Sequence, residues 1–226
     1  MSNNLNHIEQ MQYEMELRTF AQSSKKHYLS QIRLLEKYFD MPCTLITPSQ
    51  IKEYLHYRIK SGISYSNIDI ACNAFKIMFN TVLNRNWSDD IIIRPKKIQK
   101  LPVVLSRDEI IRIFSFIDNV KYKAILTTAY SAGLRISEVL NLKVTDIDSK
   151  NMSIKVNQGK GNKDRFSILG KENLNALRNY YKLYKPSDFL FPGATANKPL
   201  TARHIQATFK TALLKSGIKK MLLYTL

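Results

Sequence analysis

Hydrophobic positions in the first ninety residues recur with the spacing of amphipathic helices, not of strands. We expect a first helix over 9–21 and a second that Ser23 or Ser24 caps. A further helix over 65–85 has an apolar face made of Ile68, Ala71, Phe75, Met78, Phe79 and Val82. Such a face is typical of a packed core, so the pattern predicts that this half forms a helical bundle.

One helix start in this half has a complete capping signature. Thr47 stands at the N-cap, Pro48 in the first turn and Gln50 three residues after the cap, and Gly62 follows the helix end. The stretch 88–104 then interrupts the pattern with two prolines among basic residues, as in an interdomain linker. Such a linker could lie along a phosphate backbone, and a solvated tether explains it equally well.

The second half mixes helical and alternating patterns. Ser106 with Glu109 is a capping signature, Gly133 suits a helix C-terminal cap, and Thr201 precedes the last helix. We expect the helices of this half over 107–117, 120–132, 135–142, 171–184 and 202–215.

Between two of these helices, hydrophobic residues recur at every second position. Met152, Ile154 and Val156 alternate with polar residues, as do Phe166 and Ile168, around the turn sequence GKGNKD. This predicts an antiparallel hairpin. The fold class expected is therefore mainly α with a small antiparallel β-hairpin or sheet, divided into a helical domain over 8–90, a basic linker over 91–104 and a second domain over 105–226.

Positive charge is concentrated in one half of the chain. The net charge is +17, with 11 basic and 9 acidic residues in 1–95 and 24 and 9 in 96–226. A density of this kind favours a polyanionic partner, because each phosphate contact releases condensed counterions. A basic, well-solvated surface is the plainer alternative.

Composition excludes several other classes. Cys43 and Cys72 are far apart and match no metal-site spacing, so we expect small buried thiols in a reducing compartment. No apolar run approaches the length of about 18 residues that a membrane span needs. The polar start MSNNLNHIEQ lacks a signal-peptide core, so we expect a cytoplasmic protein without membrane contact.

Two basic residues occupy positions suited to a phosphodiester. Arg135 opens a helix after the Gly133 turn, where a guanidinium can bind two phosphate oxygens beside the positive helix end. An ion pair with Glu138 on the next turn explains it as well. Lys160 lies between two glycines at the hairpin tip, where it can approach a duplex closely, although an exposed lysine without a role is the simpler interpretation.

These segments resemble the tyrosine recombinase (phage integrase, Xer-like) family. AGLRISEVLNLKVTDID is similar to its first catalytic box and GKGNKDR to its catalytic hairpin, and the likeness continues through DFLFPG and PLTARHIQATFKTALLKSGIKK. The helical half resembles that family's core-binding domain. The resemblance implies a clamp around double-stranded DNA, attack by a tyrosine to form a 3′-phosphotyrosine link, and strand exchange in a tetramer.

By this resemblance Arg135 is the first catalytic arginine, which stabilises charge on the scissile phosphate, and Lys160 protonates the departing 5′-oxygen. Glu138 would help to orient Arg135. The family needs no metal, so no cofactor is expected. Further candidates for DNA contact are Lys25, Lys26, Lys96, Lys97, Lys163, Arg165 and Arg203.

The family pattern continues with a His-x-x-Arg box and a nucleophilic tyrosine, whereas this sequence reads GIKKMLLYTL. We therefore expect an incomplete catalytic domain that binds DNA but is impaired in cleavage, with Tyr224 an unsuitable nucleophile. We also expect reduced stability or pairing with a full-length recombinase subunit. The alternatives are a non-catalytic protein that competes at recombination sites, and an inactive mobile-element remnant.

Overall fold

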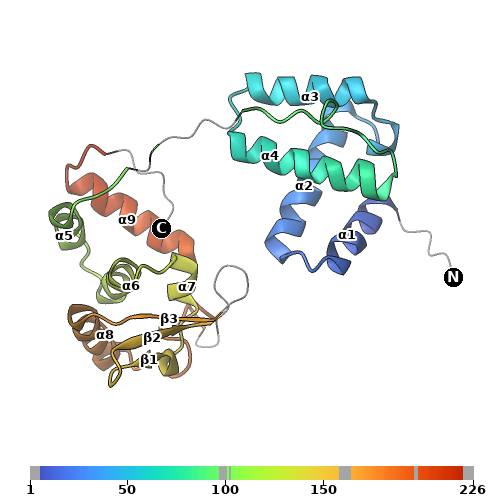
Figure 1. Cartoon of the computed structure of the whole chain (residues 1–226). Coiled ribbons are helices and arrows are strands. Elements are labelled where there is room, and N and C mark those ends of the chain that lie inside the picture. Colours follow the sequence, from blue (N-terminus) through green and yellow to red (C-terminus); the bar gives the residue numbers. More distant parts are fainter. Residues whose placement is uncertain (1–5, 97–100, 102, 158–163, 196–197, 221–226) are drawn as a thin grey trace. The chain divides into compact units, whose positions relative to one another are not determined.

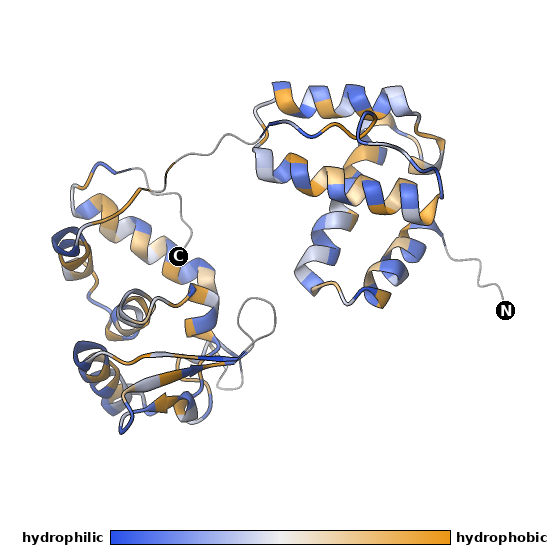
Figure 2. Ribbon diagram, in the orientation of Figure 1, coloured by the Kyte–Doolittle hydropathy of each residue, from blue (hydrophilic) through white to orange (hydrophobic). Residues whose placement is uncertain are grey.

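The computed structural model describes residues 6–96, 101, 103–157, 164–195 and 198–220 and divides the chain into two compact units, residues 1–100 and 101–226 (Figure 1). Helices dominate, and a three-stranded antiparallel sheet lies in the second unit. This confirms the expected fold class. Each helix is striped with hydrophobic and hydrophilic residues (Figure 2), as amphipathic helices require.

All the regular secondary structure described in the first unit is helical. Its elements are α1 (His7–Leu17), α2 (Gln22–Phe39), the 3-10 turn η1 (Cys43–Leu45), α3 (Pro48–Lys60), α4 (Tyr65–Phe75) and the π-helix η2 (Lys76–Val82). Their apolar faces form one core, in which Ile32, Leu35, Phe75 and Phe79 are fully buried. Cys43 and Cys72 are buried in it as free thiols, as expected.

Capping explains where one of these helices begins and fails for another. The Thr47 capping box is confirmed: the Thr47 side chain accepts from the backbone N–H of Gln50, and the Gln50 side chain accepts from the backbone N–H of Thr47. The prediction that Ser23 or Ser24 caps α2 is wrong, because that helix begins after Ala21 without any side-chain cap. The long helix expected over 65–85 also differs, since the chain widens into a π-helix at Lys76.

The second unit combines helices with the sheet. Its elements are α5 (Arg107–Ser115), α6 (Val120–Ser131), α7 (Ile136–Leu140), the 3-10 turn η3 (Val144–Asp146), β1 (Ile147–Asp148), β2 (Ser153–Val156), β3 (Arg165–Ile168), α8 (Lys171–Tyr184) and α9 (Ala202–Lys215). The Ser106 capping box starts α5 as predicted. The strand β1 was not predicted, because two residues are too few for a periodic signal.

The sheet has the order β1-β2-β3, and its register decides which residues face the core. Ile154 pairs with Ser167 and Val156 with Arg165, and both hydrophobic members are buried. Phe166 pairs with Lys155 and lies on the opposite face, where it is 73% exposed. Since side chains alternate across a strand, burial of Ile154 and Val156 brings Ser167 and Arg165 to the inner face of the sheet.

Candidate nucleic-acid interface

The site begins where α6 ends and α7 starts. Gly133 adopts the left-handed conformation with φ +60°, which lets the chain turn sharply after α6. Leu134 is then buried and Arg135 becomes the N-cap residue of α7, with its side chain 56% exposed. The backbone N–H of Arg135 donates to Glu138 Oε2 over 2.8 Å. The buried leucine therefore anchors the turn while the arginine extends outward.

Glu138 connects two arginines that are distant in sequence. Its Oε1 accepts from Arg135 Nη1 at 3.1 Å and from Arg165 Nη1 at 3.0 Å, and its Oε2 accepts from Arg165 Nη2 at 2.9 Å. The carboxylate side chain is only 7% exposed. The bidentate pairing with Arg165 is the geometry in which a guanidinium binds a carboxylate most strongly.

These hydrogen bonds set the charge state of the carboxylate. The hydrogen bonds from Arg165 are the largest cause that lowers the pKa of Glu138 to about 2, and the backbone and side chain of Arg135 lower it further, against the opposing effect of burial. Glu138 is therefore ionised at neutral pH. One negative charge serves two guanidinium groups, so the cluster retains a net charge of +1.

Arg135 is bound to Glu138 through one guanidinium nitrogen, and its side chain is 56% exposed. Within the described part of the chain, its side chain has Glu138 as its hydrogen-bond partner, through Nη1. The two interpretations of Arg135 from the sequence are thus compatible: it forms the ion pair, and it also presents N–H groups to solvent. A phosphate there would meet a guanidinium held in place by a buried carboxylate.

Both ends of the hairpin loop are anchored to the body of this unit. On one side Asn157 Nδ2 donates to Asp146 Oδ1 at 2.9 Å. On the other side Arg165 pairs with Glu138, and Ser167 Oγ donates to the carbonyl oxygen of Ala132 at 2.6 Å. Neither the Asn157–Asp146 bond nor the Ser167–Ala132 bond was predicted, because such long-range polar contacts leave no local sequence signal.

The remaining candidates divide into three groups. Lys26, Lys96 and Arg203 are exposed, as a phosphate contact requires. Lys25 does not fit that expectation, because it is 8% exposed and its ammonium lies 3.2 Å from Glu16 Oε1. The candidates Lys97, Lys160 and Lys163, and Tyr224 with them, lie outside the described residues.

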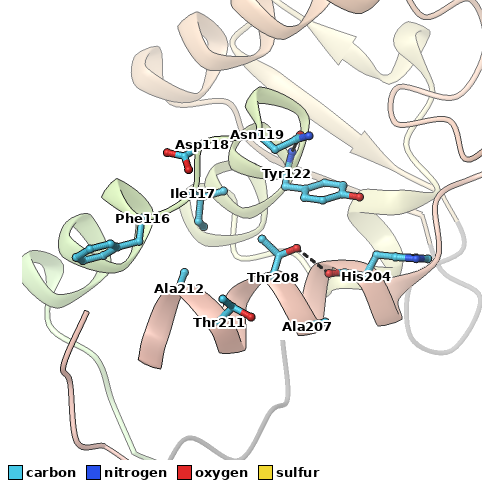
Figure 3. A pocket seen from close by; sticks show the side chains of 10 residues that line it. All are labelled: Phe116, Ile117, Asp118, Asn119, Tyr122, His204, Ala207, Thr208, Thr211 and Ala212. Atoms are coloured by element: carbon cyan, nitrogen blue, oxygen red, sulfur yellow. Dashed lines mark hydrogen bonds between the residues drawn. The ribbon is translucent and has the colours of Figure 1, made fainter. Parts of the chain in front are cut away.

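A separate depression lies between the α5–α6 junction and α9 (Figure 3), with a volume of about 460 Å³. Its lining is largely apolar or hydroxylic and comprises Phe116, Ile117, Asp118, Asn119, Tyr122, His204, Ala207, Thr208, Thr211 and Ala212. His204 Nδ1 lies 3.0 Å from the hydroxyl of Thr201, which therefore makes a side-chain contact in place of the backbone cap that we expected. The arginine cluster does not line this depression.

Comparison with known proteins identifies the family. Residues 103–224 match the model of the phage integrase family, and residues 8–89 match the phage integrase N-terminal SAM-like domain. The chain belongs to the phage integrase family. The resemblance inferred from the catalytic box and the hairpin is thereby confirmed.

Relatives and solved structures agree with this assignment. A protein of Sinorhizobium fredii named integrase/recombinase y4qK is 38% identical over 195 residues, which cover 85% of this chain and 63% of that protein. Tyrosine recombinase XerA of Pyrococcus horikoshii is 34% identical, over 62% of this chain and 49% of its own length. The chain spans less than two thirds of the length of these curated relatives.

The fold is shared with more distant integrases. A lambda integrase crystallised as a tetramer bound to a Holliday junction superposes with a TM-score of 0.76 at 17% identity, over 96% of this chain and 64% of that one. The Tn1549 transposon integrase gives 0.69 at 21% identity, over 99% of this chain and 83% of that one. In the described residues of this chain, no helix is long and apolar enough to cross a membrane.

Proposed function

We propose that this chain binds double-stranded DNA and holds one phosphodiester at Arg135, as part of a site for DNA strand cleavage and rejoining. The observation that carries the proposal is the Glu138 carboxylate, which holds Arg135 through Nη1 while more than half of the arginine side chain stays exposed. Preorganised cations that meet a phosphate in this way stabilise the charge that develops during phosphoryl transfer.

Three further facts support DNA as the ligand. The part of the chain after residue 95 has 24 basic and 9 acidic residues. The family match covers both units, and the lambda and Tn1549 integrases with this fold have structures in complex with DNA. In the proposed site Arg135 grips the phosphate and Lys160, in the loop between Asn157 and Arg165, protonates the 5′-oxygen that departs. Lys26, Lys96, Lys97, Lys163 and Arg203 would contact the DNA backbone.

We further propose that a polypeptide of these 226 residues binds DNA without forming a covalent link to it. Its sequence contains no His-x-x-Arg box, and a longer recombinase subunit paired with it would supply the second arginine clamp. With Arg135 alone, the transition-state charge is only partly neutralised.

Fluorescence anisotropy with a short labelled duplex tests the phosphate contact. We expect Arg135→Ala to weaken binding by about tenfold, because it removes roughly one charge-assisted hydrogen bond. The slope of log affinity against log salt concentration should also become shallower by about one released counterion. Arg178→Ala is the matched control, since Arg178 is an exposed arginine of α8 in the same unit. Equal affinities for the two variants would refute the role of Arg135.

A nicked suicide duplex tests the absence of cleavage separately. We expect no covalent protein–DNA adduct on a denaturing gel under conditions in which the same duplex is bound. An adduct that Tyr224→Phe abolishes would overturn this second proposal and leave the first intact. The two experiments therefore distinguish a failure of binding from a failure of the cleavage argument.

A further inference from the structure

Three side chains of the first unit bring different metal-binding groups together, in a different unit from the arginine cluster. His7 is the first residue of α1, Glu36 lies in the last turn of α2, and Cys43 opens η1. One potential ligand atom from each lies within 4.8 Å of the other two. The three residues come from three elements, so the fold and not local spacing assembles them.

The present contacts centre on one carboxylate oxygen. Glu36 Oε1 lies 2.8 Å from His7 Nε2 and accepts the backbone N–H of Cys43 at 2.9 Å. In a tetrahedral zinc site with bonds of about 2.0–2.3 Å, ligand atoms lie roughly 3.3–3.8 Å apart. A cation could therefore enter the cluster after shifts of about 1 Å or less, with the His7–Glu36 pair opening, because no other pair of ligand atoms is more than 4.8 Å apart.

The cluster is reachable from solvent on one side. His7 and Glu36 line a surface depression of about 470 Å³ together with Lys37, Asp40, Met41 and Pro42, while Cys43 is fully buried. A cation would arrive from the depression and meet the imidazole and the carboxylate first. The open side leaves room for water as a fourth ligand, and Asp40 adds a second carboxylate whose charge offsets that of Lys37.

We propose that His7, Glu36 and Cys43 form a zinc-binding site. The donor set of one imidazole nitrogen, one thiolate and one carboxylate suits Zn²⁺, whereas Mg²⁺ and Ca²⁺ prefer oxygen ligands alone. Binding forms a zinc–sulfur bond and releases the thiol proton of Cys43 to solvent. The metal would join the start of α1 to the end of α2, residues that are 29 positions apart.

Cobalt(II) is the direct probe, because a thiolate bound to it gives a charge-transfer band in the near ultraviolet. We expect the untagged, reduced full chain to show this band and to saturate at one equivalent. Cys43→Ser should abolish the band. Cys72→Ser is the matched control, since Cys72 is the other cysteine of the chain and is likewise fully buried, and this variant should keep the band.

Two further variants separate a three-ligand site from adventitious binding to a thiol. His7→Ala and Glu36→Gln change residues that are partly exposed, and each should weaken cobalt affinity at least tenfold. Zinc should raise the melting temperature of the wild-type chain and of Cys72→Ser by several degrees and leave His7→Ala unchanged. This readout holds even if Cys43→Ser does not fold.

Several results would overturn the site. One is a wild-type chain without the charge-transfer band at micromolar cobalt. Another is a band that survives in Cys43→Ser or disappears in Cys72→Ser. A third is cobalt affinity that stays unchanged in both His7→Ala and Glu36→Gln. In each case the cluster is a hydrogen-bonded tether between helices and not a metal site.

Discussion

Glu138→Gln removes the charge that holds Arg135 and Arg165, and we expect it to destabilise the second unit. The pKa of Glu138 lies at about 2, below the ordinary value of 4.5, chiefly because Arg165 donates to the carboxylate. That displacement corresponds to about 3 kcal/mol, since each pKa unit is worth roughly 1.4 kcal/mol. Arg135 and Arg165 are 56% and 39% exposed, so water recovers part of the loss, and we expect about 2 kcal/mol.

Urea denaturation followed by circular dichroism measures this loss. The matched control is Glu172→Gln, which makes the same charge change at an exposed position of α8 and should cost less than about 0.5 kcal/mol. Trp87 is the only tryptophan of the chain and belongs to the first unit, so its fluorescence reports the unfolding of that unit separately. The fluorescence transition should not move in either variant.

Acidification provides a second test with a definite sign. The pKa of Glu138 is lower in the folded protein than in the unfolded chain, so its stabilisation is complete above about pH 4.5 and is lost as the pH falls towards 2. The difference between wild type and Glu138→Gln should therefore be constant near neutrality and shrink in that window. A difference below about 0.5 kcal/mol at pH 7, or one that does not shrink on acidification, would refute the reasoning.

Two further predictions concern stability and are measured by the same denaturation experiments. Thr47→Ala removes a capping box and should cost about 1 kcal/mol, whereas Ser23→Ala should cost almost nothing because Ser23 makes no cap; similar losses would contradict the assignment of the caps. Ile154→Ala deletes a fully buried side chain of β2 and should cost about 2–5 kcal/mol, whereas Phe166→Ala on the exposed face of β3 should cost less than about 0.5 kcal/mol; the reverse order would contradict the register.

Helix starts were predictable to the extent that a local motif specifies them. Thr47 and Ser106 each have the partner three residues later that completes a capping box, and both boxes are present. Asn6 with Glu9 forms the same kind of box and was missed, although the spacing is readable in the sequence. Ser23 shows the limit of this signal, because a serine near a helix start does not cap it unless the backbone enters the helix at that residue.

The hairpin shows what periodicity alone leaves undecided. Alternation located β2 and β3 correctly, but it did not tell which face of β3 is buried: Phe166 and Ile168, the apolar alternating positions of β3, are exposed. Packing of Ile154 and Val156 into the core decides the matter and leaves Phe166 on the outer face. The same register directs Arg165 to the inner face, where it pairs with Glu138.

That choice of register links the fold to the proposed function. Arg165 reaches Glu138 across 27 positions of sequence, and Glu138 in turn holds Arg135 at the start of α7. From the sequence, Arg165 was a candidate for DNA contact and Glu138 a candidate for orienting Arg135; the contact that joins all three depends on tertiary structure. Because Arg165 is also the first residue of β3 after the loop that contains Lys160, one carboxylate fixes both the arginine and the end of the lysine's loop. A change at Glu138 should therefore disturb both proposed catalytic groups, Arg135 and Lys160. Neither the sequence around Arg135 nor that around Lys160 reveals this coupling by itself.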